Sequence, residues 1–321
     1  MPADTAPDTF QRVLIGAEGW RFLGDGNNLS ISQMVGLVRP STAVCHQWSI
    51  VLRSRASRYG SRTKTFVMPE KVCLYQRYLP DDIRVTPERF GAWLSDIGWA
   101  HYVFRDRVER QDADDLYHRG DSHTTAYGGY AASIEILRAM GLDVDGFRPT
   151  WVTAPVTSFD LYEPGEPRPS LSERVISNAP ALEVTTNGLH NRGCVTRFVN
   201  PAGSPHRVMI FGDSFANHYL SYGIALHVRE VMFVHCVNFD YEMIERYRPD
   251  TVVGEIAERF LIEPPSEGTA LPWIVESKLV DESLSPAEAA QFTASYAQFE
   301  DLYGPAMAPT LAEMRRRFDT G

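Results

Sequence analysis

The residues of this chain best suited to chemistry are Gly212-Asp213-Ser214, which follow an apolar run at 208–211. An apolar run that ends in a glycine turn before a helix is typical of a buried parallel strand. Ser214 is therefore expected at the carboxyl edge of a sheet, where open α/β folds bind their ligands. A serine hydroxyl becomes a nucleophile only when a base takes its proton and a third group orients that base. The pattern predicts a serine nucleophile that requires a nearby histidine.

The histidine is expected before Ser214 in the sequence. None of the later histidines has an aspartate three residues before it, which is the usual spacing in serine esterases with a Gly-Asp-Ser motif; they are His218, His227 and His235. Upstream, Asp121 and His123 occupy alternate positions, so in an extended segment their side chains point the same way. We therefore predict Ser214 as nucleophile, His123 as base and Asp121 as the group that orients it.

Two other interpretations of this segment remain. Asp115 and His118 have the Asp-x-x-His spacing, so His118 is the alternative base; His123 is preferred because it directly precedes a helix predicted over 125–140. Asp121 and His123 also resemble a pair of metal ligands, but no third ligand is evident from the sequence. We expect no metal and no other cofactor.

The oxyanion formed during acyl transfer needs N–H donors aimed at it. The backbone N–H of Ser214, at a helix N-terminus, is the first candidate. Asn238, which follows a strand predicted over 231–237, is the second, with Asn217 and Arg259 as alternatives. Four side chains are candidates for binding substrate, three of them aromatic and able either to stack on a sugar ring or simply to pack: Trp20, Tyr127, Tyr219 and Arg259.

The pattern around these residues predicts an α/β fold with a parallel sheet. Expected strands lie at 65–68, 100–104, 207–211, 231–237 and 251–255. Expected helices lie at 41–59, 86–97 with Thr86 as N-cap, 125–140, from 215, 241–247 and from Ser285, whose spacing to Glu288 is that of a capping box. A hairpin carrying Trp20 is expected to turn at 24–28, and 105–120 is expected to be a charged loop.

Three regions are expected along the chain. Residues 1–13 form a disordered lead, 14–265 the catalytic domain, and 266–321 a C-terminal helical extension. Within the domain, 147–205 is rich in proline and in short Val/Thr pieces, which predicts a β-rich insertion or lid.

The order Asp-x-His before Gly-Asp-Ser-Phe resembles the permuted SGNH domain of the alginate O-acetyltransferase (AlgX/AlgJ-type) family. Further similar segments are Gly-x-x-Gly-Trp-x-Phe at 16–22, a strand ending in Pro-x-Lys at 66–71, and a late strand with its Glu-Arg tail at 248–259. The resemblance covers about 14–262. Thr124 departs from it, because the family usually has tryptophan there, which puts substrate specificity in question.

The resemblance implies a three-layer, flavodoxin-like SGNH fold. It also implies O-acetyl transfer to a carbohydrate hydroxyl through a serine acyl-enzyme, with an acyl donor that a partner protein delivers. An esterase that uses water as acceptor is the alternative. An inactive glycan-binding scaffold in polysaccharide assembly is the third hypothesis.

Composition narrows the partners. A net charge of −10 and a pI near 5.4 argue against nucleic-acid binding. The basic residues clustered at 53–64 are interpreted as a solvated helix face, and the scattered Cys45, Cys73, Cys194 and Cys236 as reduced thiols. No apolar run long enough to span a membrane and no signal segment are visible, so the sequence predicts a cytoplasmic protein, whereas members of the similar family are often periplasmic.

Overall fold

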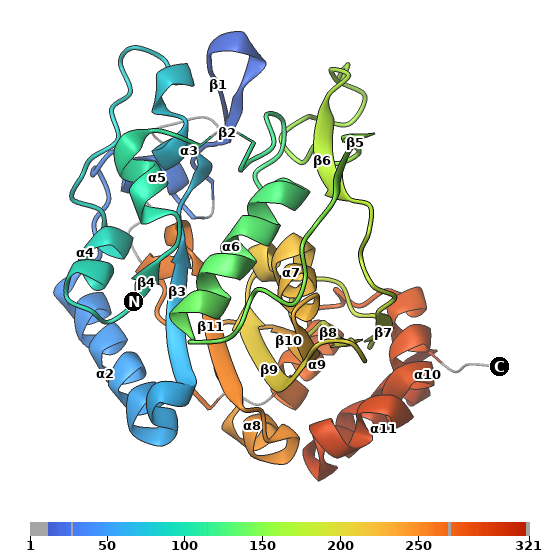
Figure 1. The fold of residues 1–321 in the computed structure, drawn as a ribbon. Coiled ribbons are helices and arrows are strands. Elements are labelled where there is room, and N and C mark those ends of the chain that lie inside the picture. Colours follow the sequence, from blue (N-terminus) through green and yellow to red (C-terminus); the bar gives the residue numbers. More distant parts are fainter. Residues whose placement is uncertain (1–11, 27, 114, 269–270, 319–321) are drawn as a thin grey trace.

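The fold is built on a mostly parallel sheet, seen in a computed structural model that describes residues 12–26, 28–113, 115–268 and 271–318 (Figure 1). In this part of the chain the main sheet has seven strands in the order β4-β3-β11-β9-β10-β8-β7. Their bounds are β3 Thr63–Met68, β4 His101–Tyr102, β7 Glu183–Thr186, β8 Val195–Val199, β9 Ser204–Gly212, β10 Val228–His235 and β11 Thr251–Ala257. β4, β3, β11, β9 and β10 are parallel, and β8 and β7 extend the sheet in antiparallel fashion.

The parallel strands follow a circularly permuted flavodoxin order. If counting starts at β9, runs to the C-terminus and returns through β3 and β4, the spatial order of the five strands becomes 2-1-3-4-5. The order then reverses between β9 and β11, which is the point where such sheets bind ligands. Ser214 follows β9, so the topology places it at this switch point.

Helices cover both faces of the sheet because its central strands alternate their buried side chains. On β9, Val208 and Ile210 belong to one apolar cluster, while Met209 and Phe211 belong to a second cluster on the opposite face. The first face is covered by α6 (Ala126–Ala139) and α7 (Ser221–Ala225), in front in Figure 1. This gives the three layers predicted from the sequence.

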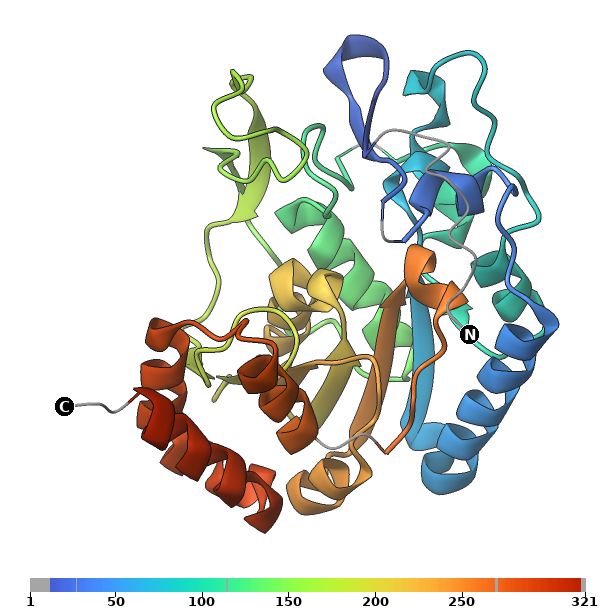
Figure 2. The same ribbon diagram turned by 180° about the vertical axis from the view of Figure 1, so that it is seen from behind.

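The opposite face carries α2 (Thr42–Tyr59), α8 (Tyr241–Tyr247) and the C-terminal helices, all in front in Figure 2. These C-terminal helices are α9 (Leu271–Val280), α10 (Pro286–Tyr303) and α11 (Ala308–Phe318), with η6 (Pro305–Met307) between the last two. None of the described helices combines the length and apolar character needed to cross a bilayer.

Several sequence predictions are confirmed at their end signals. Ser41 caps α2 by accepting a hydrogen bond from the N–H of Val44, and Thr125 caps α6 by accepting one from Gly128. Ser285 and Glu288 form the expected capping box of α10. These ends were predictable because caps are local: side chain and backbone partner lie within three residues.

Three predictions about the N-terminal half were wrong. The helix expected from Thr86 begins four residues later, as α4 (Phe90–Asp96), because the Thr86 hydroxyl accepts from Glu88 in a local turn instead of capping a helix. The segment expected to be a loop contains α5 (Arg105–Arg110). The hairpin of β1 (Val13–Ile15) and β2 (Arg21–Leu23) turns through η1 (Ala17–Gly19), not at 24–28.

The remaining short elements lie between these: α1 (Ser30–Met34), η2 (Gly60–Arg62), α3 (Lys71–Leu74), η3 (Gln76–Tyr78) and η5 (Glu258–Ile262). Residues 1–11 lie outside the described residues, so the prediction of a disordered lead is not addressed there. Val13, which was placed in the lead, pairs with Leu23 in the β1–β2 hairpin.

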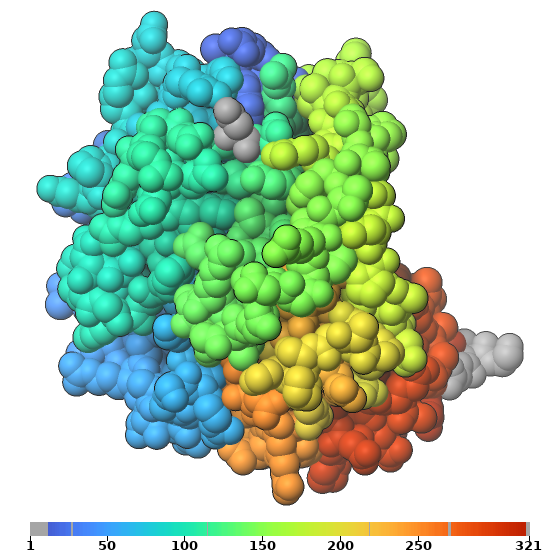
Figure 3. Space-filling model, viewed as in Figure 1, coloured from blue at the N-terminus to red at the C-terminus, as the bar shows by residue number. Residues whose placement is uncertain are grey.

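The proline-rich region divides into two parts. β5 (Trp151–Pro155) and β6 (Ser172–Ile176) form a separate antiparallel pair, which we call the arm together with its connection 156–171. β7 and β8 instead join the main sheet. In Figure 3 the arm, in yellow-green, rises beside the N-terminal part of the chain, in blue and teal. The expected β-rich insertion is therefore split between an arm and a sheet extension.

Candidate active site

The turn after β9 fixes Ser214. The Asp213 carboxylate accepts hydrogen bonds from the N–H groups of Phe215 (2.9 Å) and Ala257 (2.7 Å), tying the turn to β11. A Cβ on Gly212 would lie 2.6 Å from a carboxyl oxygen of Glu255, so only glycine fits. The chain continues into a π-helical segment, η4 (Ala216–Leu220), a form that is frequent at functional sites.

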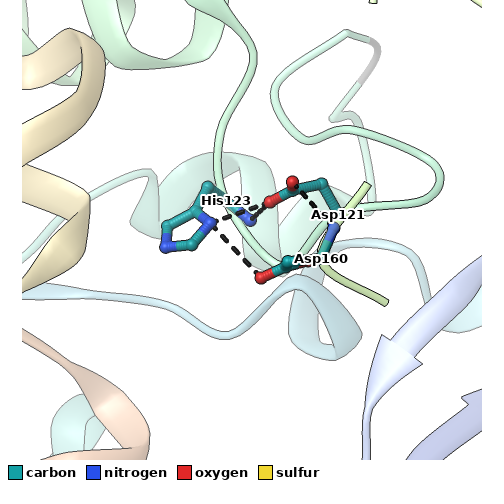
Figure 4. Close-up of side chains that lie close together, drawn as sticks. All are labelled: Asp121, His123 and Asp160. Carbon is teal, nitrogen blue, oxygen red and sulfur yellow. Dashed lines mark hydrogen bonds and ion pairs between the residues drawn. The ribbon is translucent and has the colours of Figure 1, made fainter. Parts of the chain in front are cut away.

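Ser214, His123 and Asp121 form one chain of contacts. His123 Nε2 lies 2.9 Å from Ser214 Oγ, and His123 Nδ1 lies 2.8 Å from Asp121 Oδ1. Asp121 Oδ1 also accepts from the backbone N–H of His123 at 2.9 Å, which holds the carboxylate against the ring (Figure 4). In this geometry Nε2 is placed to take the serine proton while Nδ1–H donates to Asp121.

The arm completes the surroundings of Asp121. The second carboxyl oxygen of Asp121, Oδ2, accepts hydrogen bonds from Ser158 Oγ at 2.5 Å and from the N–H of Asp160 at 3.2 Å. Burial by itself would raise the pKa of Asp121, but the hydrogen bonds from His123 and Ser158 outweigh it and hold the pKa below its usual value. Asp121 is therefore an ionised acceptor.

A second carboxylate, Asp160, stands beside the imidazole and was not predicted from the sequence. Its Oδ2 lies 3.5 Å from His123 Nδ1 and accepts from Ser122 Oγ at 2.5 Å (Figure 4). Burial, with the charge of Asp121 added to it, raises the pKa of Asp160. No local motif marks Asp160, because it reaches the site through the fold of the arm.

Lys71 holds the loop that carries Asp121. Its ammonium group is 3% exposed and donates to the backbone carbonyls of His118 (2.9 Å), Asp121 (2.8 Å) and Arg119 (3.3 Å). Burial lowers the pKa of Lys71 to about 7. The Pro-x-Lys segment was the one sequence signal for Lys71. The structure places this residue under residues 117–125, which carry Asp121 and His123 and which we call the catalytic loop because of their proposed role.

His118, the alternative base, lies elsewhere. Its Nε2 is 3.7 Å from Glu173 of the arm, and burial lowers its pKa. The contact with Ser214 Oγ is made by His123. Glu173, like Asp160, was not predicted.

Two candidate substrate or oxyanion residues are engaged in other contacts. The side-chain oxygen of Asn238 accepts from the N–H of Ser266 at 2.9 Å. Arg259 is 4% exposed and donates to Glu70 at 2.9 Å, with its guanidinium 5.3 Å from the ring of Phe215. Arg259 therefore supports, from inside the protein, the helical segment that contains Phe215.

The aromatic candidates lie around two cavities beside the catalytic loop. Trp20 stacks on Tyr75 and Tyr78, with ring centroids 4.3 and 4.8 Å away, and lines a cavity of about 550 Å³. Tyr219 lines a second cavity of about 490 Å³. Tyr127 packs under the guanidinium of Arg174, 3.7 Å from its ring centre. We call these the first cavity and the second cavity.

The structure does bring together three groups of metal-ligand type. One ligand atom from each of Asp121, His123 and Asp160 lies within 4.8 Å of the others. However, two ligands on a tetrahedral metal with bonds of about 2.0–2.1 Å stand roughly 3.3 Å apart. The Nδ1 of His123 and Oδ1 of Asp121 are 2.8 Å apart, a hydrogen-bond distance, so the geometry favours a hydrogen-bonded pair.

The fold is similar to that of known structures. Bacillus cereus PatB1 matches with a TM-score of 0.53 and 13% identity, over 78% of this chain and 96% of that one; a second PatB1 structure, with a sulfonyl adduct, gives 0.52 and 12% over 79% and 98%. A DHHW family protein from Eubacterium siraeum gives 0.52 and 13% over 76% and 90%. No family model and no curated protein matches the sequence.

At 12–13% identity these likenesses show a shared fold and nothing finer. They agree with the mixed α/β architecture of the sheet and its helices. The roles of individual residues have to be argued from the geometry.

Proposed function

We propose that this protein is a serine-dependent acyltransferase that transfers an acetyl group to carbohydrate hydroxyls. Ser214 is the nucleophile, His123 the base and Asp121 its orienting group. The observation that carries the proposal is the pair of contacts at 2.9 and 2.8 Å that joins Ser214 to His123 and His123 to Asp121. This is the geometry that nucleophilic catalysis by serine requires.

The reaction proceeds in two halves. Ser214 Oγ attacks the carbonyl carbon of the donor as His123 Nε2 takes its proton; the bond to the donor's leaving atom then breaks, and that atom receives the proton from His123. In the second half an acceptor hydroxyl gives its proton to His123 and attacks the acyl carbon. The bond to Oγ breaks, and Oγ regains the proton. No redox change and no cofactor enter either half.

The N–H of Ser214 is the proposed first donor to the oxyanion, because it lies at the start of a helical segment after β9. Asn238 remains the predicted second donor. Its Oδ1 accepts from the N–H of Ser266, and its side-chain nitrogen is the group that would donate to the oxyanion.

The first cavity supports a carbohydrate acceptor. Trp20 and Tyr78 give it aromatic surface, and Arg119 and Glu173 give it charged hydrogen-bonding groups. Sugars combine apolar ring faces with hydroxyls, so they suit such a lining. Its walls include Tyr117, His118 and Thr125, which come from the same loop as His123 and support an acceptor that approaches from this side. From the family resemblance we also propose that a partner protein delivers the acyl donor.

The test is acylation of Ser214. Wild-type protein should release p-nitrophenol from p-nitrophenyl acetate, and intact mass should show one added acetyl group. Ser214→Ala and His123→Ala should lose both signals, while His118→Ala keeps them. A sulfonyl fluoride should label wild type and not Ser214→Ala; PatB1, with the same fold, has been solved with a sulfonyl adduct.

Acceptors then separate the alternatives. An acetylated oligosaccharide product identifies the transferase, and acetate released at the same rate with or without oligosaccharide identifies the esterase. Loss of activity in His118→Ala with full activity in His123→Ala would reject the proposed base. If the wild-type protein neither hydrolyses the ester nor is labelled by the sulfonyl fluoride, the transferase and the esterase are both rejected. The glycan-binding scaffold is then the remaining hypothesis.

A further inference from the structure

The second cavity differs from the first in its chemistry. It has a volume of about 490 Å³, and its lining is mostly aromatic and aliphatic. Its walls come from α6, η4, α7, β6 and β8, chiefly through Ala126, Tyr130, Val175, Phe198, Tyr219 and Tyr222. None of the roles proposed above uses this cavity.

The cavity lies along the two helical segments that leave the triad. Ala126, the first residue of α6, is three positions after His123, and η4 begins two positions after Ser214. The two segments are in direct contact, because a Cβ on Gly129 would lie only 2.4 Å from the Cβ of Tyr219. An acyl group attached to Ser214 Oγ therefore begins at the end of the contact between α6 and η4, and the second cavity lies along this contact.

Glu173 of the arm separates the two cavities. One carboxyl oxygen accepts from the N–H of Ala126 at 2.9 Å, and the other accepts from the hydroxyl of Tyr219 at 3.5 Å. Glu173 lines the first cavity and Tyr219 lines the second. Burial and the charge of Glu173 raise the pKa of Tyr219 to about 12, so the phenol is a neutral donor to Glu173.

The lining selects for hydrocarbon. Unlike the first cavity, this one has no charged side chain in its lining, and the hydroxyls of Tyr130 and Tyr219 already contact His227 and Glu173. A sugar placed here would therefore lose more hydrogen bonds to water than the lining replaces. A hydrocarbon chain gains instead, about fourfold in binding for each methylene buried. An acetyl group offers a single methyl and would leave most of the cavity unused.

We infer that the second cavity binds the hydrocarbon chain of the donor's acyl group, and that Ser214 therefore accepts acyl groups several carbons longer than acetyl. This inference rests on the proposed acyl-enzyme and widens its acyl group. The carbonyl carbon is bonded to Oγ, and the hydrocarbon chain lies over the contact of α6 with η4 and α7, facing Val175 of β6 and Phe198 of β8. The leaving atom departs with the proton that His123 took from Ser214. The acceptor approaches from the first cavity, on the other side of Glu173.

The experiment is a chain-length series of p-nitrophenyl esters from acetate to decanoate. In wild type, kcat/KM should rise about fourfold per methylene until the cavity is full. Val175→Phe narrows the cavity from the arm and should lower the hexanoate-to-acetate ratio of kcat/KM at least tenfold. The matched control is Val280→Phe, the same change on α9 at a side chain that is 67% exposed. It should keep the hexanoate-to-acetate ratio of kcat/KM at its wild-type value.

A second variant guards against misfolding of the first. Tyr222→Ala enlarges the cavity and should move the best substrate to a longer chain. The inference is overturned if acetate is the best substrate of wild type, or if both cavity variants keep its chain-length profile. Turnover of no ester at all, with no sulfonyl labelling of Ser214, rejects the proposed function and the inference with it.

Discussion

The catalytic corner and the C-terminal helices are held together by opposite means. Around Asp121, buried charges and backbone carbonyls satisfy one another, with Lys71 under the loop and Ser158 and Asp160 above it. Between α9, α10 and α11, aromatic and aliphatic side chains fill the space, with Phe292 and Tyr303 stacked at 5.7 Å. Hydrogen bonds have direction and fix orientation, whereas apolar burial supplies free energy without direction. Damage to the first region should therefore cost activity, and damage to the second should cost stability.

The largest effect is expected at Asp121. Asp121→Asn removes the charge that selects the tautomer of His123, and turnover should fall about 10⁴-fold. Its melting temperature should stay within a few degrees of wild type. Asp112→Asn, in an exposed ion pair with Arg107 and outside the lining of both cavities, is the control and should keep activity. A drop in turnover of less than tenfold in Asp121→Asn would show that the base is oriented by another group.

Phe292→Ala should break the other region. The side chain is fully buried, and truncating such an aromatic costs about 3–5 kcal/mol. Denaturant unfolding should show the loss, while kcat at a temperature where the variant is folded should match wild type. A large fall in kcat of the folded variant would show that the C-terminal helices also shape the site.

Lys71 is expected to affect both activity and stability, because its buried ammonium group holds the loop that carries Asp121. Lys71→Met keeps much of the apolar stem but removes the ammonium donor from the buried carbonyls of His118 and Asp121, a cost of about 2–3 kcal/mol. Turnover should fall at least tenfold because the Asp121 loop is released. Lys64→Met, at an exposed lysine that donates to Ala139, should change neither property, and kinetics with unfolding curves would show the difference.

The smallest effect is expected at Glu288. Burial opposes its ionisation, but hydrogen bonds from His190 and Ser285 with the charge of Lys278 outweigh this and lower its pKa to about 2. Because the folded pKa is the lower one, the stabilisation is complete above about pH 4.5 and is lost as the pH falls toward 2. Glu288→Gln should therefore lose about 1 kcal/mol at pH 7 and match wild type near pH 2. A gap that persists at pH 2 would point to packing.

The sequence predicts the site best where the signal is local. Asp121 and His123 are only two residues apart, and Gly212 and Ser214 mark the end of a strand. The contact between His123 and Ser214, which are 91 positions apart, then follows from the order of the strands in the sheet. The capping box of Ser285 and Glu288 was predictable for the same reason.

The rest depends on tertiary contacts that have no local pattern. Ser158, Asp160 and Glu173 come from the arm, whose position is set by its contacts with α6 and the catalytic loop. Thr86 looks like a helix cap, but a hydroxyl followed by proline suits a local turn equally well. Arg259 ends the Glu-Arg tail of the segment 248–259, and nothing in that segment indicates that it pairs with Glu70 in the interior of the protein.

The place of β11 has a consequence for the order of synthesis. It is the last strand of the parallel core to leave the ribosome, yet it lies between β3 and β9. Until it arrives, the pair β4-β3 and the strands from β9 onward have no shared strand. The bond from Ala257 to Asp213 that fixes the nucleophile's turn is also missing. Asp121, His123 and Ser214 are therefore all synthesised before β11, whereas the turn that carries Ser214 gains its hydrogen bond from Ala257 only when β11 has inserted between its two neighbours.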